Sequence, residues 1–323
     1  MRTISVCLLL SFEVLAGGAT SRKAFSKRSQ VSDLISEVIS GGANPNSIVN
    51  RVSHLGEEAF ASHELGSLLL KEPDLDKRRV MVQIVAGLAH PQGEAGLLAV
   101  LNDDDGPVRM YSAQGLGRMH SKAAGPRLAH SLADQTLGVR RDAARALGQL
   151  ADSKYGPALA NAVKGEDDPD TRAVMLLALG QVADKRQQPV LESFLSHSSE
   201  STRFAAAAGL CVLGAPSGTK FARALLASKD RHQRMQGLVL FEGSRAKQAA
   251  AVLKPLLEDP DRAIQAVAAR ILYQGGDKAQ LDWLVLTSFQ SLGEDRMPYE
   301  RELEVLRLPD DERRAILRKA GIK

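Results

Sequence analysis

The chain has 323 residues, enough for two ordinary domains or for one long array of repeats. Its hydrophobic content of 44% excludes a wholly disordered protein. Aromatic residues make up only 4%, which favours closely packed helices over a sheet rich in valine, isoleucine and tyrosine. The net charge of +4 is a weak basic bias and by itself indicates neither a nucleic-acid nor a membrane partner.

Residues 1–19 have the order of a secretory signal peptide. Arg2 is followed by an apolar run over residues 4–15 and then by small residues. The run is shorter than the roughly 20 residues that span a bilayer, so we predict no membrane span. We therefore expect a periplasmic or secreted protein. Glu13 within the run fits the alternative, an apolar leading helix of a cytoplasmic protein.

Residues 20–44 are predicted to precede and cap the rest of the fold. The stretch at 20–30, "TSRKAFSKRSQ", is basic and polar, which is typical of a flexible arm. The stretch that follows, "VSDLISEVIS", has apolar residues at helical spacing and stops at two glycines. It predicts an N-terminal capping helix.

From residue 45 to residue 290 one pattern returns every 30 to 32 residues. An arginine at position 0 is followed by a small or apolar residue at +4, most often leucine at +7, and glycine at +8 in four copies. These positions share one face of an α-helix, so each copy predicts an amphipathic helix, called helix B. The residues assigned to position 0 are Arg79, Arg109, Arg140, Arg172, Arg203, Arg234 and Gln265. A weaker eighth copy with Ile48 and Val52 precedes them.

A second apolar segment lies between successive copies and predicts a helix A. An example is "GPRLAHSLA" at 125–133, where Pro126 stands at the helix start and sacrifices no hydrogen bond. A single pair of such helices cannot bury both apolar stripes, but pairs stacked side by side can. The sequence therefore predicts an all-α fold, an α-solenoid of about seven to eight helical hairpins over residues 45–290 with a repeat near 31 residues.

The repeated pattern also carries a family resemblance. The segments "DGPVR", "DPDTR" and "DRHQR", each followed by an apolar helix, resemble the HEAT-like repeats of phycobilisome lyases over about residues 45–290. This resemblance implies a structural ladder of hydrogen bonds between repeats, made by the recurring aspartates and arginines. The implied ladder residues are Asp105, Arg109, Arg140, Asp168, Arg172, Arg203, Asp230 and Arg234.

Residues 291–323 leave the repeat pattern. The segment "MPYERELEVLRLPDDERRAILRKAGIK" predicts two short charged helices, the second starting at Pro309-Asp310 and stopping at Gly321. Solenoid ends need such cover because the last apolar stripe has no following repeat. We therefore assign 291–323 to C-terminal capping helices.

The sequence offers little for catalysis. No close group of histidine, cysteine and carboxylate residues has metal-ligand spacing, so we predict no metal, no cofactor and no catalytic residue. The HEAT-like deoxyhypusine hydroxylases bind iron through several His-Glu pairs, whereas this chain has only His63-Glu64. Cys211 stands in a glycine position of the repeat, where a buried thiol is inert. The alternative is an enzyme of the bilin-lyase type, centred on Cys211 or His63.

A nucleic-acid-binding function is the other alternative, because alkylpurine DNA glycosylases are also built from HEAT-like repeats. Such a protein needs a basic concave surface with aromatic residues that hold a nucleotide. The single tryptophan, Trp283, lies near the C-terminal end, where we interpret it as a packed residue of a terminal helix. We therefore predict no nucleic-acid partner.

The B helices of a HEAT-type solenoid line its concave face, so their positions +1, +2 and +5 are the expected contact surface. These positions are more apolar here than a solvated surface requires, which indicates a contact with protein. Tight packing between helices is the alternative reason for this apolar character. We predict a non-catalytic binding scaffold for another protein or an extended peptide. The predicted contact residues are Met110, Tyr111, Arg141, Arg145, Leu177, Phe204, Met235 and Arg270.

Overall fold

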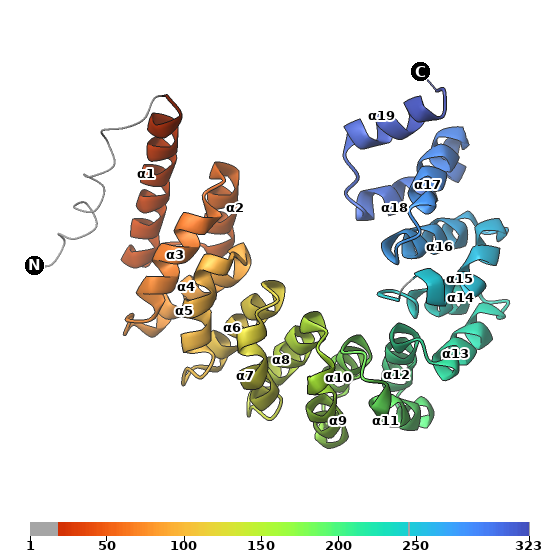
Figure 1. Ribbon diagram of the computed structural model, residues 1–323, viewed down its shortest axis with the longest axis horizontal. Coiled ribbons are helices and arrows are strands. Elements are labelled where there is room, and N and C mark those ends of the chain that lie inside the picture. Colours follow the sequence, from red (N-terminus) through yellow and green to blue (C-terminus); the bar gives the residue numbers. More distant parts are fainter. Residues whose placement is uncertain (1–18, 245, 323) are drawn as a thin grey trace, which may run out of the picture. The chain divides into compact units, whose positions relative to one another are not determined.

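The computed structural model of the protein describes residues 19–244 and 246–322. Within these residues all regular structure is helical, with 19 α-helices and several short 3-10 turns (Figure 1). None of these helices is both long and apolar enough to cross a membrane. Apart from its last residue, the predicted signal peptide at 1–19 lies outside the described residues. The chain divides into two compact units between Arg127 and Leu128.

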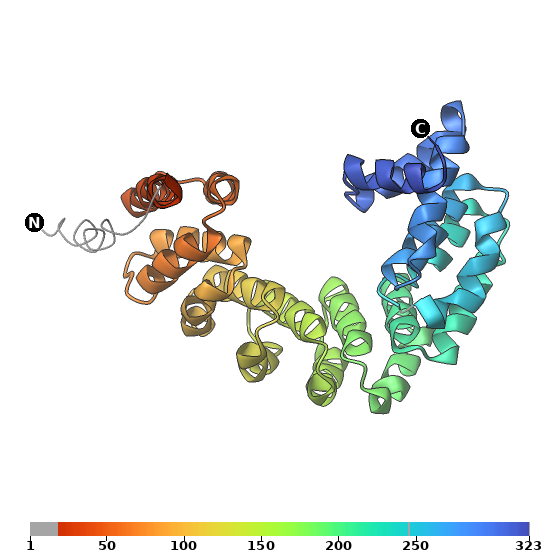
Figure 2. The same ribbon diagram turned by 45° about the horizontal axis from the view of Figure 1, so that its top comes forward.

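Each predicted repeat is a hairpin of one A helix and one B helix, and Figure 2 shows the same paired helices from a second direction. The fold is an α-solenoid, as predicted. The seven hairpins, A helix first, are α3 (Glu58–Leu69) with α4 (Leu75–Leu88), α5 (Glu94–Val100) with α6 (Gly106–Arg118), α7 (Gly125–Ser131) with α8 (Leu137–Leu150), α9 (Gly156–Gly165) with α10 (Pro169–Gln181), α11 (Gln188–Ser193) with α12 (Glu200–Leu213), α13 (Pro216–Leu226) with α14 (Arg231–Val239), and α15 (Ala246–Leu253) with α16 (Arg262–Gln274).

The +4 and +7 side chains of the B helices form the core between neighbouring repeats. In α10 these are Leu176 and Leu179, which are both fully buried, as are Ala144 and Leu147 of α8. Burial of each leucine contributes about 1.5–3 kcal/mol. Helices α8, α10 and α12 of unit 2 pack side by side, so each B helix shields the apolar stripe of the next.

Both ends of the B helices are fixed by recurring local structure. A capping side chain begins most of them: Asp168, for example, accepts a hydrogen bond from the backbone N–H of Thr171 at 2.7 Å. The residue at position +11 adopts the left-handed conformation in six copies, and in four of them the side chain of the next residue caps a short 3-10 turn; these capping residues are His90, Ser121, Asp152 and Asp184. The left-handed residues at this position are Ala89, His120, Ala151, Ala183, Gly214 and Gly276.

The first repeat starts one residue earlier than the sequence pattern indicated. Every position-0 side chain hydrogen-bonds to backbone carbonyls five or six residues before it, and in α4 it is Arg78, not Arg79, that reaches the carbonyls of Glu72 and Pro73. In this register the +8 residue is the buried Ala86, whereas Gly87 is exposed. With Arg78 as origin, the spacing to Arg109 is 31 residues.

The prediction that residues 20–30 form a flexible arm is wrong, because they belong to helix α1 (Ala19–Ser40), which continues into the predicted capping helix. Two of its basic side chains reach helices and turns nearby. Lys27 donates to the carbonyl of Leu55 at 2.6 Å, and Arg28 lies 3.5 Å from Glu57. Helix α2 (Pro45–Leu55) follows, with Ile48 and Val52 of the weaker copy buried.

The C-terminal segment forms α17 (Ala279–Gln290), α18 (Met297–Val305) and α19 (Asp310–Lys319). Tyr299 and Leu303 of α18 are buried against α16 and α17. Tyr299 donates a hydrogen bond to Gln265 of α16 at 2.5 Å, and Trp283 packs edge-on against the Tyr299 ring. Helix α18 therefore covers the last B helix.

Candidate binding groove on the B helices

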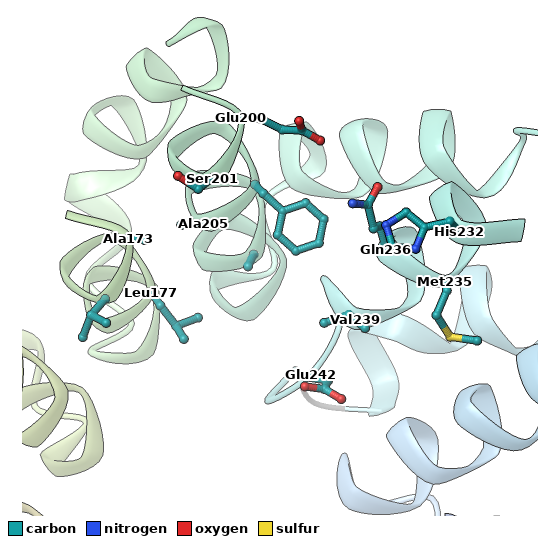
Figure 3. A pocket seen from close by; sticks show the side chains of 13 residues that line it. Ala173, Leu177, Glu200, Ser201, Ala205, His232, Met235, Gln236, Val239 and Glu242 are labelled. Atoms are coloured by element: carbon teal, nitrogen blue, oxygen red, sulfur yellow. The ribbon is translucent and has the colours of Figure 1, made fainter. Parts of the chain in front are cut away.

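A groove of about 860 Å³ lies over three consecutive B helices of unit 2, α10, α12 and α14 (Figure 3). We call it the B-helix groove. It is lined by side chains that are partly or fully exposed, and most of them are apolar. The lining residues are Ala173, Val174, Leu177, Glu200, Ser201, Phe204, Ala205, Ala208, His232, Met235, Gln236, Val239 and Glu242.

The groove contains every +1, +2 and +5 residue of these three helices. Position 0 reaches back to the loop, and +4 and +7 point into the core, so the remaining face of each B helix carries +1, +2 and +5. Phe204 and Met235 rest on the buried core cluster with part of their surface and leave the other part open to the groove. The groove floor is therefore apolar and is supported by packed side chains.

Charge occurs at the edges of the groove. Figure 3 shows Glu200 and Glu242 on opposite sides of the groove, with Leu177 and Met235 at heights between them. Among the described residues that line the groove there is no lysine or arginine, and His232 is exposed. The groove thus offers an apolar floor between two carboxylates.

Three predicted contact residues, Leu177, Phe204 and Met235, come together in this groove. Met110 and Tyr111 lie on α6 in unit 1, where both are half-buried. The remaining three contact residues are arginines, and none of them lines the groove.

On α8, positions +1, +2 and +5 are Arg141, Asp142 and Arg145. Arg145 forms an ion pair with the buried Asp142, and Arg141 is half-buried. Since α8 packs beside α10, the apolar floor ends at this charged helix.

Arg270, a predicted contact residue, does not present a free charge. Its side chain is 10% exposed and pairs with Glu242 at 2.7 Å and with Glu302 of α18. Position +1 of α16, Ala266, is fully buried beside Tyr299. The groove therefore ends at α16 because α18 covers the face that the earlier B helices leave open.

Sequence reasoning missed Glu200 and His232 as lining residues. They stand four and three residues before a +1 position, and a spacing of four residues keeps side chains on one helical face. Extending the +1 and +5 series one turn toward the helix start would have found Glu200.

The recurring arginines and aspartates act mainly within their own repeat. Arg172 donates to the carbonyls of Glu166 and Asp167, and Arg203 donates to those of His197 and Ser198 at 2.8 and 2.9 Å. Asp105, Asp168 and Asp230 cap the first turns of their B helices, and Arg109, Arg140 and Arg234 bond to the loops before theirs. These contacts hold each A–B loop against the B helix that follows it.

Ion pairs between repeats use a partly different set of carboxylates from the implied ladder. Arg140 pairs with Glu166 of the next repeat at 2.7 Å, and this hydrogen bond lowers the pKa of the buried Glu166 carboxyl. In unit 1, Arg78 pairs with Asp103 at 3.1 Å, and Arg79 pairs with Asp105 at 2.7 Å. These ion pairs link neighbouring repeats, and two of their carboxylates, Asp103 and Glu166, are residues that the resemblance did not indicate.

Comparison with known families decides the identity of the fold. The profile of the HEAT repeats matches residues 63–148 and 156–240, just over half of the chain, and that of the PBS lyase HEAT-like repeat matches residues 139–165. The chain belongs to the HEAT repeat family. No curated protein sequence matches this HEAT repeat protein.

Three solved structures are similar to this chain at low sequence identity. The complex of CpcE and CpcF of phycocyanin lyase from Nostoc sp. PCC7120 is 20% identical, covers 76% of this HEAT chain and 94% of its own, and gives a TM-score of 0.53. YibA of Escherichia coli is 18% identical, covers 75% of this chain and 91% of its own, and gives a TM-score of 0.38. Human deoxyhypusine hydroxylase in complex with glycerol is 19% identical, covers 76% of this chain and 96% of its own, and gives a TM-score of 0.33. At 20% identity the similarity to the phycocyanin lyase complex shows the fold alone.

The residues weighed for catalysis belong to different units of this HEAT protein. Cys211 is buried on α12, and burial raises the pKa of its thiol to about 12. His63 is exposed on α3, in the other unit. Among residues 19–244 and 246–322, no three histidine, cysteine or carboxylate residues are grouped so that they could hold a metal ion.

Proposed function

We propose that this HEAT repeat protein is a non-catalytic scaffold that holds a segment of another protein in the B-helix groove. The observation that carries the proposal is that the +1, +2 and +5 residues of three consecutive B helices, nine residues in all, line one open apolar floor. Exposed apolar surface of this kind is a feature of protein contact sites. Met235 adds an unbranched side chain that adapts to differently shaped partners.

The charge of the groove supports a protein partner over a nucleic acid. A nucleic-acid site gains most of its affinity from lysine and arginine side chains against phosphates. The described lining has Glu200 and Glu242 instead, and neither carboxylate favours a phosphate backbone. One solved structure with a similar fold, that of CpcE and CpcF, is itself a complex of two proteins, which supports a protein partner for this chain as well.

Capture of the partner from the native cell envelope tests the proposal. We expect the parent chain to retain a partner that Phe204→Asp and Val239→Asp variants lose, because a charge on the floor is desolvated by the bound segment. Phe289→Asp is the matched control, since Phe289 is 47% exposed on α17 outside the groove. Loss of capture in all three variants, or in none, contradicts the proposal.

Phe204 also packs on the core, so its variant has a second readout. We expect the helical circular dichroism signal and the melting temperature of Val239→Asp to stay close to those of the parent, since Val239 is 37% exposed. Capture lost only in Phe204→Asp, together with its helical signal, would show that Phe204 serves the fold and that the groove is not a docking site.

A lyase-type enzyme is the second candidate, because the fold neighbour is a phycocyanin lyase. Such an activity would have to use a thiol or an imidazole of this chain. A thiol with a pKa of about 12 is protonated at neutral pH and is a poor nucleophile. Activity that survives in both Cys211→Ser and His63→Ala variants would dispose of these residues as its centre.

We also propose that the protein acts in the periplasm or outside the cell. The support is the order of charge, apolar run and small residues over 1–19. N-terminal sequencing of the mature protein tests it. A mature chain that starts near residue 20 supports export, and one that retains residue 2 supports a cytoplasmic protein.

A further inference from the structure

We infer that the occupant of the B-helix groove is an amphipathic helix with basic residues at both ends of its apolar stripe. The inference rests on the proposed function, since it describes the partner segment that the groove selects. Three features of the groove carry it: the backbone that lines it, the spacing of its carboxylates, and their charge.

The backbone of the groove favours a helix over an extended peptide. All the lining helices use their N–H and C=O groups internally, so they offer no edge to which an extended strand can add. Only five of the thirteen lining side chains could bond an extended backbone, and three of them are the edge residues Glu200, His232 and Glu242, which leaves Ser201 and Gln236. A strand on this floor would bury unpaired backbone groups, whereas a helix satisfies its own.

The two carboxylates stand near opposite ends of the repeat pattern, on different repeats. Glu200 is at −3 of the repeat that contains α12, and Glu242 is at +8 of the repeat that contains α14, just beyond the end of that helix. A partner helix that runs along the B helices would match this difference with basic residues eleven positions apart. Eleven residues of α-helix rise about 16 Å and make three turns, so two residues eleven apart lie on one face. Leucine, methionine or phenylalanine side chains between them would cover Leu177, Phe204 and Met235.

The charge of the groove selects lysine or arginine at the ends of that helix. Glu200 is exposed and lies at one side of the groove, and Glu242 lies at the other. Glu242 already contacts Arg270, but Arg270 also serves Glu302, so two carboxylates share one guanidinium. That cluster keeps an excess negative charge for the end of an incoming helix.

Fluorescence anisotropy of the full chain with labelled peptides tests the inference. The probe is an alanine- and glutamine-based peptide with two lysines eleven positions apart and leucines three, four and seven positions after the first lysine, which places all five on one helical face. Three matched peptides carry glutamates in place of the lysines, glutamines in place of the lysines, or a central proline on the opposite face.

We expect the lysine peptide to bind most tightly and the glutamine peptide more weakly. The glutamate peptide should bind most weakly of these three, with affinity falling by about two- to fivefold for each end. The proline peptide should lose about tenfold or more, because it cannot form a continuous helix. Glu200→Gln and Glu242→Gln should each reduce the preference for lysine over glutamate, while the control Glu258→Gln, an exposed carboxylate outside the groove, should leave it unchanged.

Equal binding of the proline and lysine peptides overturns the helical occupant, and equal binding of the lysine and glutamate peptides overturns the selection of charge. In both cases loss of binding in Phe204→Asp but not in Phe289→Asp leaves the docking groove standing. Binding of the peptides that survives Phe204→Asp, or no binding of any peptide, overturns the inference and counts against the groove itself.

Discussion

The contact between α10 and α12 depends on a glycine that cannot be enlarged. A Cβ atom on Gly180 would lie 2.2 Å from the carbonyl oxygen of Gly209 and 2.5 Å from its Cα. Both are backbone atoms of α12, so no side chain can turn aside. Ordinary contact begins near 3.4 Å, so the helices would have to separate by about 1.2 Å at this point.

The Gly180→Ala variant therefore sets two effects against each other. Alanine favours the helix by about 1 kcal/mol over glycine. Overpacking costs about 1–3 kcal/mol, and the separation would loosen contacts of the fully buried Leu176 and Leu179. We expect a net loss of up to about 2 kcal/mol in the free energy of unfolding.

Urea unfolding followed by circular dichroism measures the effect. Gly165→Ala is the matched control, because a Cβ there meets nothing within 4 Å, and it should be neutral or stabilising by up to about 1 kcal/mol. If Gly180→Ala proves as stable as Gly165→Ala, the two helices do not pack with backbone against backbone, and the reasoning is refuted.

Three further predictions concern the turns, the ion pairs and the thiol. Ala183→Gly should stabilise the chain by about 0.5–1 kcal/mol and Gly214→Ala should destabilise it by about 1–2 kcal/mol, because their φ values of 56° and 79° suit glycine; urea midpoints that move the other way contradict this. Arg140→Gln should cost about 1–3 kcal/mol at neutral pH. Because the folded pKa of Glu166 lies below its ordinary 4.5, this pair stabilises the fold above pH 4.5 and loses its effect as pH falls through the folded pKa, so an Arg140→Gln deficit that is unchanged in acid contradicts the pairing. Cys211, with its pKa of about 12, should resist iodoacetamide at neutral pH until urea unfolds the chain, and rapid labelling of the native protein would show an accessible thiol.

The repeat could be predicted from sequence because burial at +4 and +7 leaves a mark in every copy. The exact start of the first copy could not be predicted, because Arg78 and Arg79 are adjacent and Gly87 lies eight residues after Arg79, at the spacing of the glycine in later copies. Only the hydrogen bonds from Arg78 to the preceding loop decide between them. The residue pattern predicted the period of the repeat to within one residue, whereas tertiary contacts determine the register of each copy.

The groove was predictable in part for the same reason. Leu177, Phe204 and Met235 were found from their positions in the repeat, since position alone decides which way a B-helix side chain faces. Arg270 occupies an equivalent position but is covered by α18, a segment outside the repeat pattern. The helical state of residues 20–30 was missed because a basic composition indicates solvent exposure, which a helix with one open face also satisfies.

The account's central claim is that the face formed by α10, α12 and α14 holds the partner. Hydrogen–deuterium exchange of the full chain, with and without the lysine peptide, tests it most directly. The account predicts slower exchange in residues 169–181, 200–213 and 231–239, which form those three helices, when the peptide is bound. Protection that appears instead at α17 and α18, with these three helices unchanged, would contradict it.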